Sequence, residues 1–90
     1  MNSVNENITF DLEEDVRGGR CPLPMLRAKR GLNKLEVGQV VKVISTDPNS
    51  YDDFVAMLKH LSHELVEYQE LPSPIAHFKQ EFHFYIRKGR

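Results

Sequence analysis

The chain has 90 residues, 40% of them hydrophobic, which suits one small domain with a modest core. Its net charge of -1 argues against a nucleic-acid binder that depends on bulk positive charge. No apolar run reaches the roughly 18 residues of a membrane span, and the N-terminus lacks the pattern of a secretory signal. We expect a cytoplasmic monomer without direct nucleic-acid or membrane contacts.

The beginning of the chain predicts a tail followed by a strand. Residues 1–7 are polar, and we expect them to be a disordered N-terminus ahead of a single domain over residues 8–90. Ile8, Phe10 and Leu12 alternate with polar residues, which predicts a strand. Two consecutive glycines then break the pattern and predict a turn.

Residues 22–35 have the pattern of a helix. Pro22 and Pro24 fall in the first turn, where a missing backbone N–H costs little. Gly31 weakens the middle of this helix. One apolar face is predicted from four residues that lie three or four positions apart: Met25, Ala28, Leu32 and Leu35.

Residues 39–46 are rich in β-branched side chains and predict a strand covered on both faces. Pro48 ends this strand, and Asn49 or Ser50 can cap a second helix. The second helix is expected to bury an apolar stripe of Tyr51, Phe54 or Val55, Leu58 and Leu61.

Two further strands complete the chain. Residues 64–70 predict a third strand, residues 71–80 a loop with two prolines, and residues 82–87 a final strand. The order is β-α-β-α-β-β. Because two helices cannot cover both faces of four strands, we expect a two-layer α/β sandwich, with a four-stranded mixed sheet and both helices on one face.

Cys21 is the only cysteine, so it cannot form a disulfide within the chain or a zinc site with cysteine partners. One interpretation is a small buried hydrophobe. The other is a reactive thiol, because Cys21 is expected at the N-cap of the first helix, where unpaired N–H groups and the helix dipole favour a thiolate. Such a position, with basic neighbours, lowers the pKa of a cysteine.

Positive charge gathers around this cysteine. Residues 22–35 contain no acid, and the basic side chains near Cys21 are Arg17, Arg20, Arg27, Lys29, Arg30 and Lys34. A solvated helix face explains such a run. It also fits a surface for partner docking and thiolate stabilisation, for which Arg20, Arg27 and Arg30 are the candidates.

The motif Cys21-Pro22-Leu23-Pro24 resembles the Cys-Pro-x-Pro motif of the TusA/SirA-like sulfur-carrier family. The resemblance extends from about Asp15 to Arg90. Its further markers are Asp15, Gly18, Gly38, Thr46-Asp47-Pro48, His63-Glu64-Leu65-Val66 and Tyr85-Ile86-Arg87-Lys88-Gly89.

The resemblance implies the same β-α-β-α-β-β sandwich and a sulfur-carrier or sulfurtransferase function. Cys21 would accept sulfane sulfur as a persulfide, with Gly18, Pro22 and Pro24 supporting the loop. The donor would be a cysteine desulfurase or rhodanese-like protein. The acceptor would be a relay protein in tRNA thiolation, cofactor synthesis or sulfur metabolism. No cofactor or metal is implied, and the chain would relay sulfur rather than act alone as a turnover enzyme.

Two departures from the family pattern stand out. Gly19 replaces a leucine that is usual in the family, which could loosen the cysteine loop, and residues 72–80 are longer than a tight hairpin. Two other functions stay open: a non-catalytic regulatory or protein-interaction module, and a redox sensor that forms a mixed disulfide through Cys21. The histidines, His60, His63, His77 and His83, are expected at the surface or at helix ends rather than around a metal.

Overall fold

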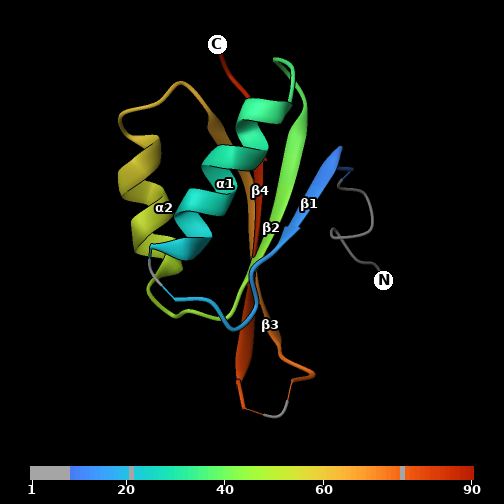
Figure 1. Cartoon of the computed structure of the whole chain (residues 1–90), viewed down its shortest axis with the longest axis vertical. Coiled ribbons are helices and arrows are strands. Elements are labelled where there is room, and N and C mark those ends of the chain that lie inside the picture. The colour runs from blue at the N-terminus through green and yellow to red at the C-terminus, as the bar shows by residue number, and fades with distance from the viewer. Residues whose placement is uncertain (1–8, 21, 76) are drawn as a thin grey trace.

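Both helices lie on one side of a four-stranded sheet in the computed structural model (Figure 1), which confirms the predicted two-layer fold. The structure describes residues 9–20, 22–75 and 77–90, so the predicted tail at residues 1–7 lies outside it. In chain order the elements are β1 (Leu12–Asp15), α1 (Leu23–Lys34), β2 (Val40–Ser45), α2 (Ser50–Leu58), β3 (Glu64–Pro72) and β4 (Gln80–Arg87). Neither described helix is long and apolar enough to cross a membrane.

The strand order in the sheet is β1-β2-β4-β3. β1 pairs with β2 in parallel, and β4 runs antiparallel to both of its neighbours, β2 and β3. The carboxyl ends of β1 and β2 therefore meet at one edge of the sheet, together with the amino end of β4. We call this edge, with the loops that leave it, the loop end of the sheet.

Some element boundaries differ from the predictions. The first strand begins at Leu12, and Asp11 just before it bonds Val40 twice: its N–H donates to the Val40 carbonyl at 2.8 Å, and its carboxylate accepts the Val40 N–H at 2.9 Å. The second helix ends at Leu58, so Leu61 falls outside it. The loop between β3 and β4 covers only residues 73–79, because strand pairing continues to Pro72.

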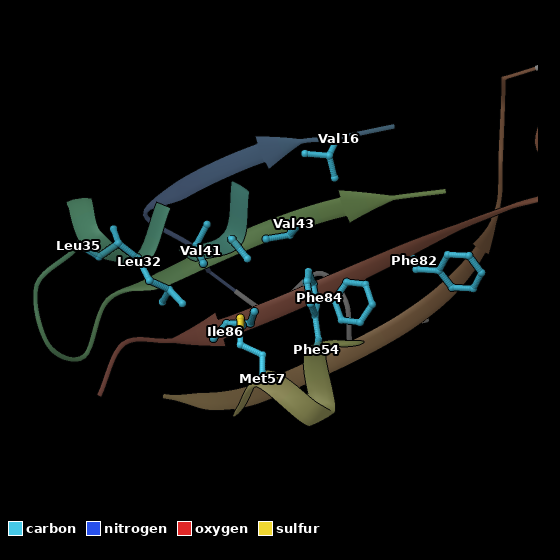
Figure 2. Close-up of a cluster of buried hydrophobic side chains, with 11 residues drawn as sticks. Val16, Leu32, Leu35, Val41, Val43, Phe54, Met57, Phe82, Phe84 and Ile86 are labelled. Carbon is cyan, nitrogen blue, oxygen red and sulfur yellow. The ribbon is translucent and has the colours of Figure 1, made fainter. Parts of the chain in front are cut away.

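The main core lies between the helices and the sheet (Figure 2). Phe54 of α2 contacts Phe84 of β4 edge-on, with 4.3 Å between the ring centroids. Met57 replaces Tyr51 in the predicted stripe, since Met57 is buried and Tyr51 is exposed. The cluster consists of Val16, Ala28, Leu32, Leu35, Val41, Val43, Phe54, Met57, Phe82, Phe84 and Ile86.

Gly31 explains how α1 approaches the sheet so closely. A Cβ atom at this position would lie 3.2 Å from Val41 Cγ2 and 3.3 Å from both Glu14 Cγ and Leu12 Cδ2. The residue that weakens the helix in isolation therefore permits contact with β1 and β2 together.

The sheet face without helices is also partly buried. Glu81, His83 and Tyr85 of β4 are each less than 10% exposed. The ring of Phe10, which precedes β1, packs against Tyr85 with 6.2 Å between centroids, and Lys42 Nζ lies 5.2 Å and 5.7 Å from the centroids of these two rings. The central strand β4 is thus covered on both faces.

We predict that Gly31→Val lowers the free energy of unfolding by about 1–3 kcal/mol, because the added side chain must displace β1 or β2. Asn33→Val is the matched control, since Asn33 is exposed on the same helix. Asparagine and valine have similar helix propensity, so this substitution tests valine in the helix without the close approach to the sheet. Urea unfolding followed by circular dichroism measures both variants. Equal midpoints for the two variants would show that α1 does not need the close approach.

Candidate functional site

The loop that leads from β1 to the cysteine is held at the loop end of the sheet. Gly18 adopts a φ of +87°, a left-handed conformation that favours glycine. Its backbone N–H donates to Thr46 Oγ1 at 2.9 Å, and the N–H of Gly19 donates to the carbonyl of Val16 at 2.9 Å. Cys21 lies outside the described residues, and this anchored loop leads directly to it.

Helix α1 begins one residue later than predicted. Its N-cap is Pro22, so Cys21 precedes the N-cap instead of occupying it. The N–H of Leu23 donates to the carbonyl of Arg20 at 2.8 Å, and Pro22 and Pro24 have no N–H to offer. The start of α1 therefore has fewer free backbone N–H groups than we expected from the sequence, although the helix dipole remains.

Gly19 sits against the first residue of α1. A Cβ atom on Gly19 would lie 2.6 Å from Leu23 Cδ2 and 3.2 Å from the Val16 carbonyl oxygen. The Leu23 side chain thus covers the loop at the point where the family pattern has a leucine. A looser cysteine loop stays a prediction.

Arg17 joins the loop to two strands. Its guanidinium bonds Asp15 at 2.7 Å and Glu81 at 3.0 Å, which connects the end of β1 with the start of β4. These hydrogen bonds raise the pKa of Arg17, and the hydrogen bonds from Arg17 lower the pKa of Asp15 despite some burial. The positive charge of Arg17 is therefore already compensated within the fold.

Glu81 is a buried carboxylate that contacts Arg17, His83 and, at 3.4 Å, the hydroxyl of Ser73. Burial would raise its pKa, but hydrogen bonds from His83 and Arg17 outweigh this effect and lower the pKa below the ordinary value. The distance from Glu81 Oε1 to His83 Nε2 is 3.1 Å. Ionised Glu81 thus belongs to the native state.

The predicted basic surface divides into paired and unpaired cations. Arg27 Nη2 lies 2.9 Å from Oε1 of the buried Glu14, so this arginine links α1 to β1. Arg20 and Arg30 are exposed, and neither forms an ion pair with a described residue. Among the three predicted docking arginines, only Arg20 and Arg30 have their charge available to a partner.

One pocket adjoins the loop that leads to Cys21, and a second pocket adjoins the first. The first has a volume of about 280 Å³, and its walls are Gly18, Gly19, Arg20, Thr46, Asp47, Pro48 and Phe78. The second has a volume of about 340 Å³, and its walls are Thr46, Pro48, His77, Phe78, Lys79, Gln80 and Phe82. The two pockets share three walls and form one groove along the loop end of the sheet.

The predicted supporting residues and the histidines have distinct environments. Pro22 is exposed, whereas Pro24 is buried in the first turn of α1. His63 Nδ1 accepts a hydrogen bond from the N–H of Gly89 at 2.9 Å, and it lies beyond the end of α2. The described residues contain no group of three or more histidine, cysteine or acidic side chains arranged to hold a metal ion.

Comparisons with known proteins identify relatives along most of the chain. The family model described as Sulfurtransferase TusA matches residues 13–88. A protein of Allochromatium vinosum named sulfur carrier protein TusA is 47% identical over 80 residues, covering 89% of this chain and 96% of that protein. A protein of the same name from Pseudomonas syringae pv. syringae is 38% identical, covering 77% and 82% respectively.

A solved structure has the same fold. The crystal structure of a SirA-like protein from Desulfitobacterium hafniense matches with a TM-score of 0.64 and 25% sequence identity. The match covers 89% of this chain and all of that one.

We predict that Glu81→Gln lowers the free energy of unfolding at pH 7 by about 1–3 kcal/mol, because charge-assisted hydrogen bonds are lost. Because the pKa of Glu81 in the folded state is below its ordinary value of 4.5, the ionised carboxylate stabilises the fold at pH values above 4.5. This contribution is lost as the pH falls through the folded-state pKa. The difference between wild type and variant should therefore shrink below about pH 4.5. Urea unfolding between pH 7 and pH 3 measures it.

Glu67→Gln is the control for this experiment, because Glu67 lies opposite Tyr85 on the neighbouring strand and makes no described ion pair. A constant difference between Glu81→Gln and wild type across the pH range would contradict the assigned role of the ionised carboxylate.

Proposed function

Because the chain belongs to the TusA sulfurtransferase family, and thus functions as a sulfur carrier, we propose that Cys21 carries the sulfur as a persulfide. The observation that supports this assignment is the Cys-Pro-Leu-Pro motif, which contains the only cysteine of a chain matched by the family model over residues 13–88. A carrier must bind its sulfur covalently, and Cys21 is the only thiol available for this.

The proposed transfer consists of two thiol exchanges without net oxidation. The Cys21 thiolate attacks the outer sulfur of a donor persulfide, so a new S–S bond forms while the donor's S–S bond breaks and releases the donor thiolate. A thiolate of the acceptor then attacks the outer sulfur on Cys21 and releases the Cys21 thiolate. The proton of the transferred sulfur exchanges with solvent at each step.

The absence of a second cysteine supports a carrier over a redox switch within one chain. A neighbouring thiol could attack the persulfide on Cys21 and form a disulfide, which would discharge the sulfur as sulfide. A chain with one thiol holds its persulfide until another molecule accepts the sulfur.

The surroundings of Cys21 favour the thiolate. Arg20, its direct neighbour in the sequence, makes no described ion pair, and the next residue, Pro22, is the N-cap at the positive end of α1. Since Leu23 has no free amide, we assign more of the thiolate stabilisation to Arg20 than to backbone donors. Gly18 supports the loop through its left-handed turn.

The partners of this reaction are proteins. We place the donor among cysteine desulfurases or rhodanese-like proteins, and the acceptor among relay proteins of tRNA thiolation, cofactor synthesis or sulfur metabolism. Both exchanges would take place in the cytoplasm, where free thiols remain reduced. The exposed basic side chains of α1 would contact acidic surfaces of these partners.

Incubation of the protein with a cysteine desulfurase and free cysteine should add about 32 Da, one sulfur atom, to its intact mass. Cys21→Ser should gain no sulfur and keep the same unfolding midpoint. Reduction with dithiothreitol should remove the added mass. An unchanged mass of the wild type, or an equal gain by Cys21→Ser, would refute the persulfide assignment. Retained biological function of Cys21→Ser would favour the non-catalytic docking module.

Charge reversal separates docking from folding in the basic surface. Arg30→Glu should slow sulfur transfer from the desulfurase about threefold to tenfold with unchanged stability, since this side chain has no described ion pair. Arg27→Glu should also lower the free energy of unfolding by about 1–3 kcal/mol, because buried Glu14 loses its partner. Transfer rates and urea unfolding measure the two effects.

Lys59→Glu is the control for net charge, since this exposed lysine follows α2. Equal slowing by Lys59→Glu and Arg30→Glu would contradict a specific docking role for α1.

A further inference from the structure

We propose that the groove along the loop end of the sheet binds an extended, acidic and apolar polypeptide segment that flanks the reacting cysteine of the partner protein. This inference rests on the proposed function, because it concerns the partner in sulfur exchange at Cys21. It assigns a role to residues 77–79 of the loop between β3 and β4, which supply one wall of the groove.

The groove begins beside the cysteine and leads away from it. Arg20 lines the first pocket and directly precedes Cys21 in the sequence. Phe78 borders both pockets, and Lys79 borders the second. A partner cysteine that reaches Cys21 therefore has neighbouring residues within reach of the groove.

The shared walls of the groove favour apolar side chains. Pro48 and Phe78 belong to both pockets, and the buried ring of Phe82 closes the second. Thr46 Oγ1 already accepts the N–H of Gly18, and Asp47 Oδ1 accepts the N–H of Asn49 at 3.0 Å. The side chains of Thr46 and Asp47 thus already accept hydrogen bonds within the fold.

The charges around the groove select an acidic occupant. The charged side chains are Arg20, at the end next to the cysteine, and Lys79, at the other end, where His77 also lines the groove. All three side chains belong to exposed residues, and neither Arg20 nor Lys79 pairs with a described acid. Asp47 is the only acid in the walls, and it is buried. Cations at both ends match carboxylates separated along an extended chain.

The arrangement of the groove favours a polypeptide over a small anion. A small anion would satisfy the cations at one end, whereas a segment with acidic side chains on both sides of apolar ones would contact both ends and the apolar walls together. In Figure 1 the ends of β3 and β4 project beyond the other loops at this end, so an extended segment can lie along them.

Disulfide exchange tests the groove without any sulfur transfer. Two short peptides, Cys-Gly-Leu-Asp-Leu-Glu and Cys-Gly-Leu-Lys-Leu-Lys, are each linked to glutathione by a disulfide and mixed with the reduced protein. Attack of the Cys21 thiolate on the peptide sulfur links the protein to the peptide and releases glutathione. Attack on the glutathione sulfur links the protein to glutathione and releases the peptide. Intact mass measures the ratio of the peptide adduct to the glutathione adduct at equilibrium. We expect the ratio to be about fivefold higher for the acidic peptide.

Variants of the groove should change this ratio. Lys79→Glu should reduce the preference for the acidic peptide to less than about twofold, and Phe78→Ala should lower the peptide-to-glutathione ratio for both peptides. Lys59→Glu changes the net charge equally, but lies outside the groove and should leave the preference intact.

Three results would overturn the inference: equal ratios for the two peptides, as a groove that binds only small anions would give; an equal effect of Lys59→Glu and Lys79→Glu; and glutathione adducts alone with both peptides. The experiment needs only the thiol of Cys21. A preference for the acidic peptide together with a failure to gain sulfur from a desulfurase would therefore retain the groove and refute the persulfide assignment.

Discussion

The parallel pairing of β1 with β2 is the constraint on which the site depends. Parallel strands end at the same edge, so the loop after β1, which leads to Cys21, must meet the segment after β2. The hydrogen bond from Gly18 to Thr46 is the direct result. Because β4 is antiparallel to β2, the loop before β4 reaches the same edge and brings Phe78 to the groove. Gly31 allows the connecting helix to pack closely over this strand pair.

The fold uses some of its cations for structure and leaves others for partners. Arg17 and Arg27 are both paired with acids that are nearly completely buried, Glu81 and Glu14 respectively. Replacing either arginine would leave a buried carboxylate without its partner, which is costly. Arg20 has no such partner among the described residues. A basic residue near the cysteine in sequence is therefore not always an unpaired one: Arg17 is held by acids of the fold, whereas Arg20 makes no ion pair with a described residue.

Local patterns were sufficient to predict the order of the elements, the two-layer fold and the turn before the cysteine. Exact boundaries were missed, as at Asp11, whose carboxylate accepts the Val40 N–H just ahead of β1. The ion pairs were missed for another reason: Arg27 meets Glu14 over 13 positions and Arg17 meets Glu81 over 64. Periodicity carries no information on such contacts, and the groove, which combines three separate loops, was equally invisible.

The two outer strands of the sheet have a consequence for self-association. β1 contributes the sequence Leu-Glu-Glu-Asp to one border, and β3 carries three glutamates along the other, with an irregularity between Leu65 and Glu67 and a proline at its end. Exposed borders of sheets invite pairing with further chains unless charge or distortion prevents it. Glu14, Asp15 and Glu64 are paired with arginines, but Glu13 on one border and Glu67 and Glu70 on the other make no described ion pair, so both borders keep negative charge that disfavours pairing with a further strand. This edge charge works against border-to-border pairing between copies of the sulfur carrier.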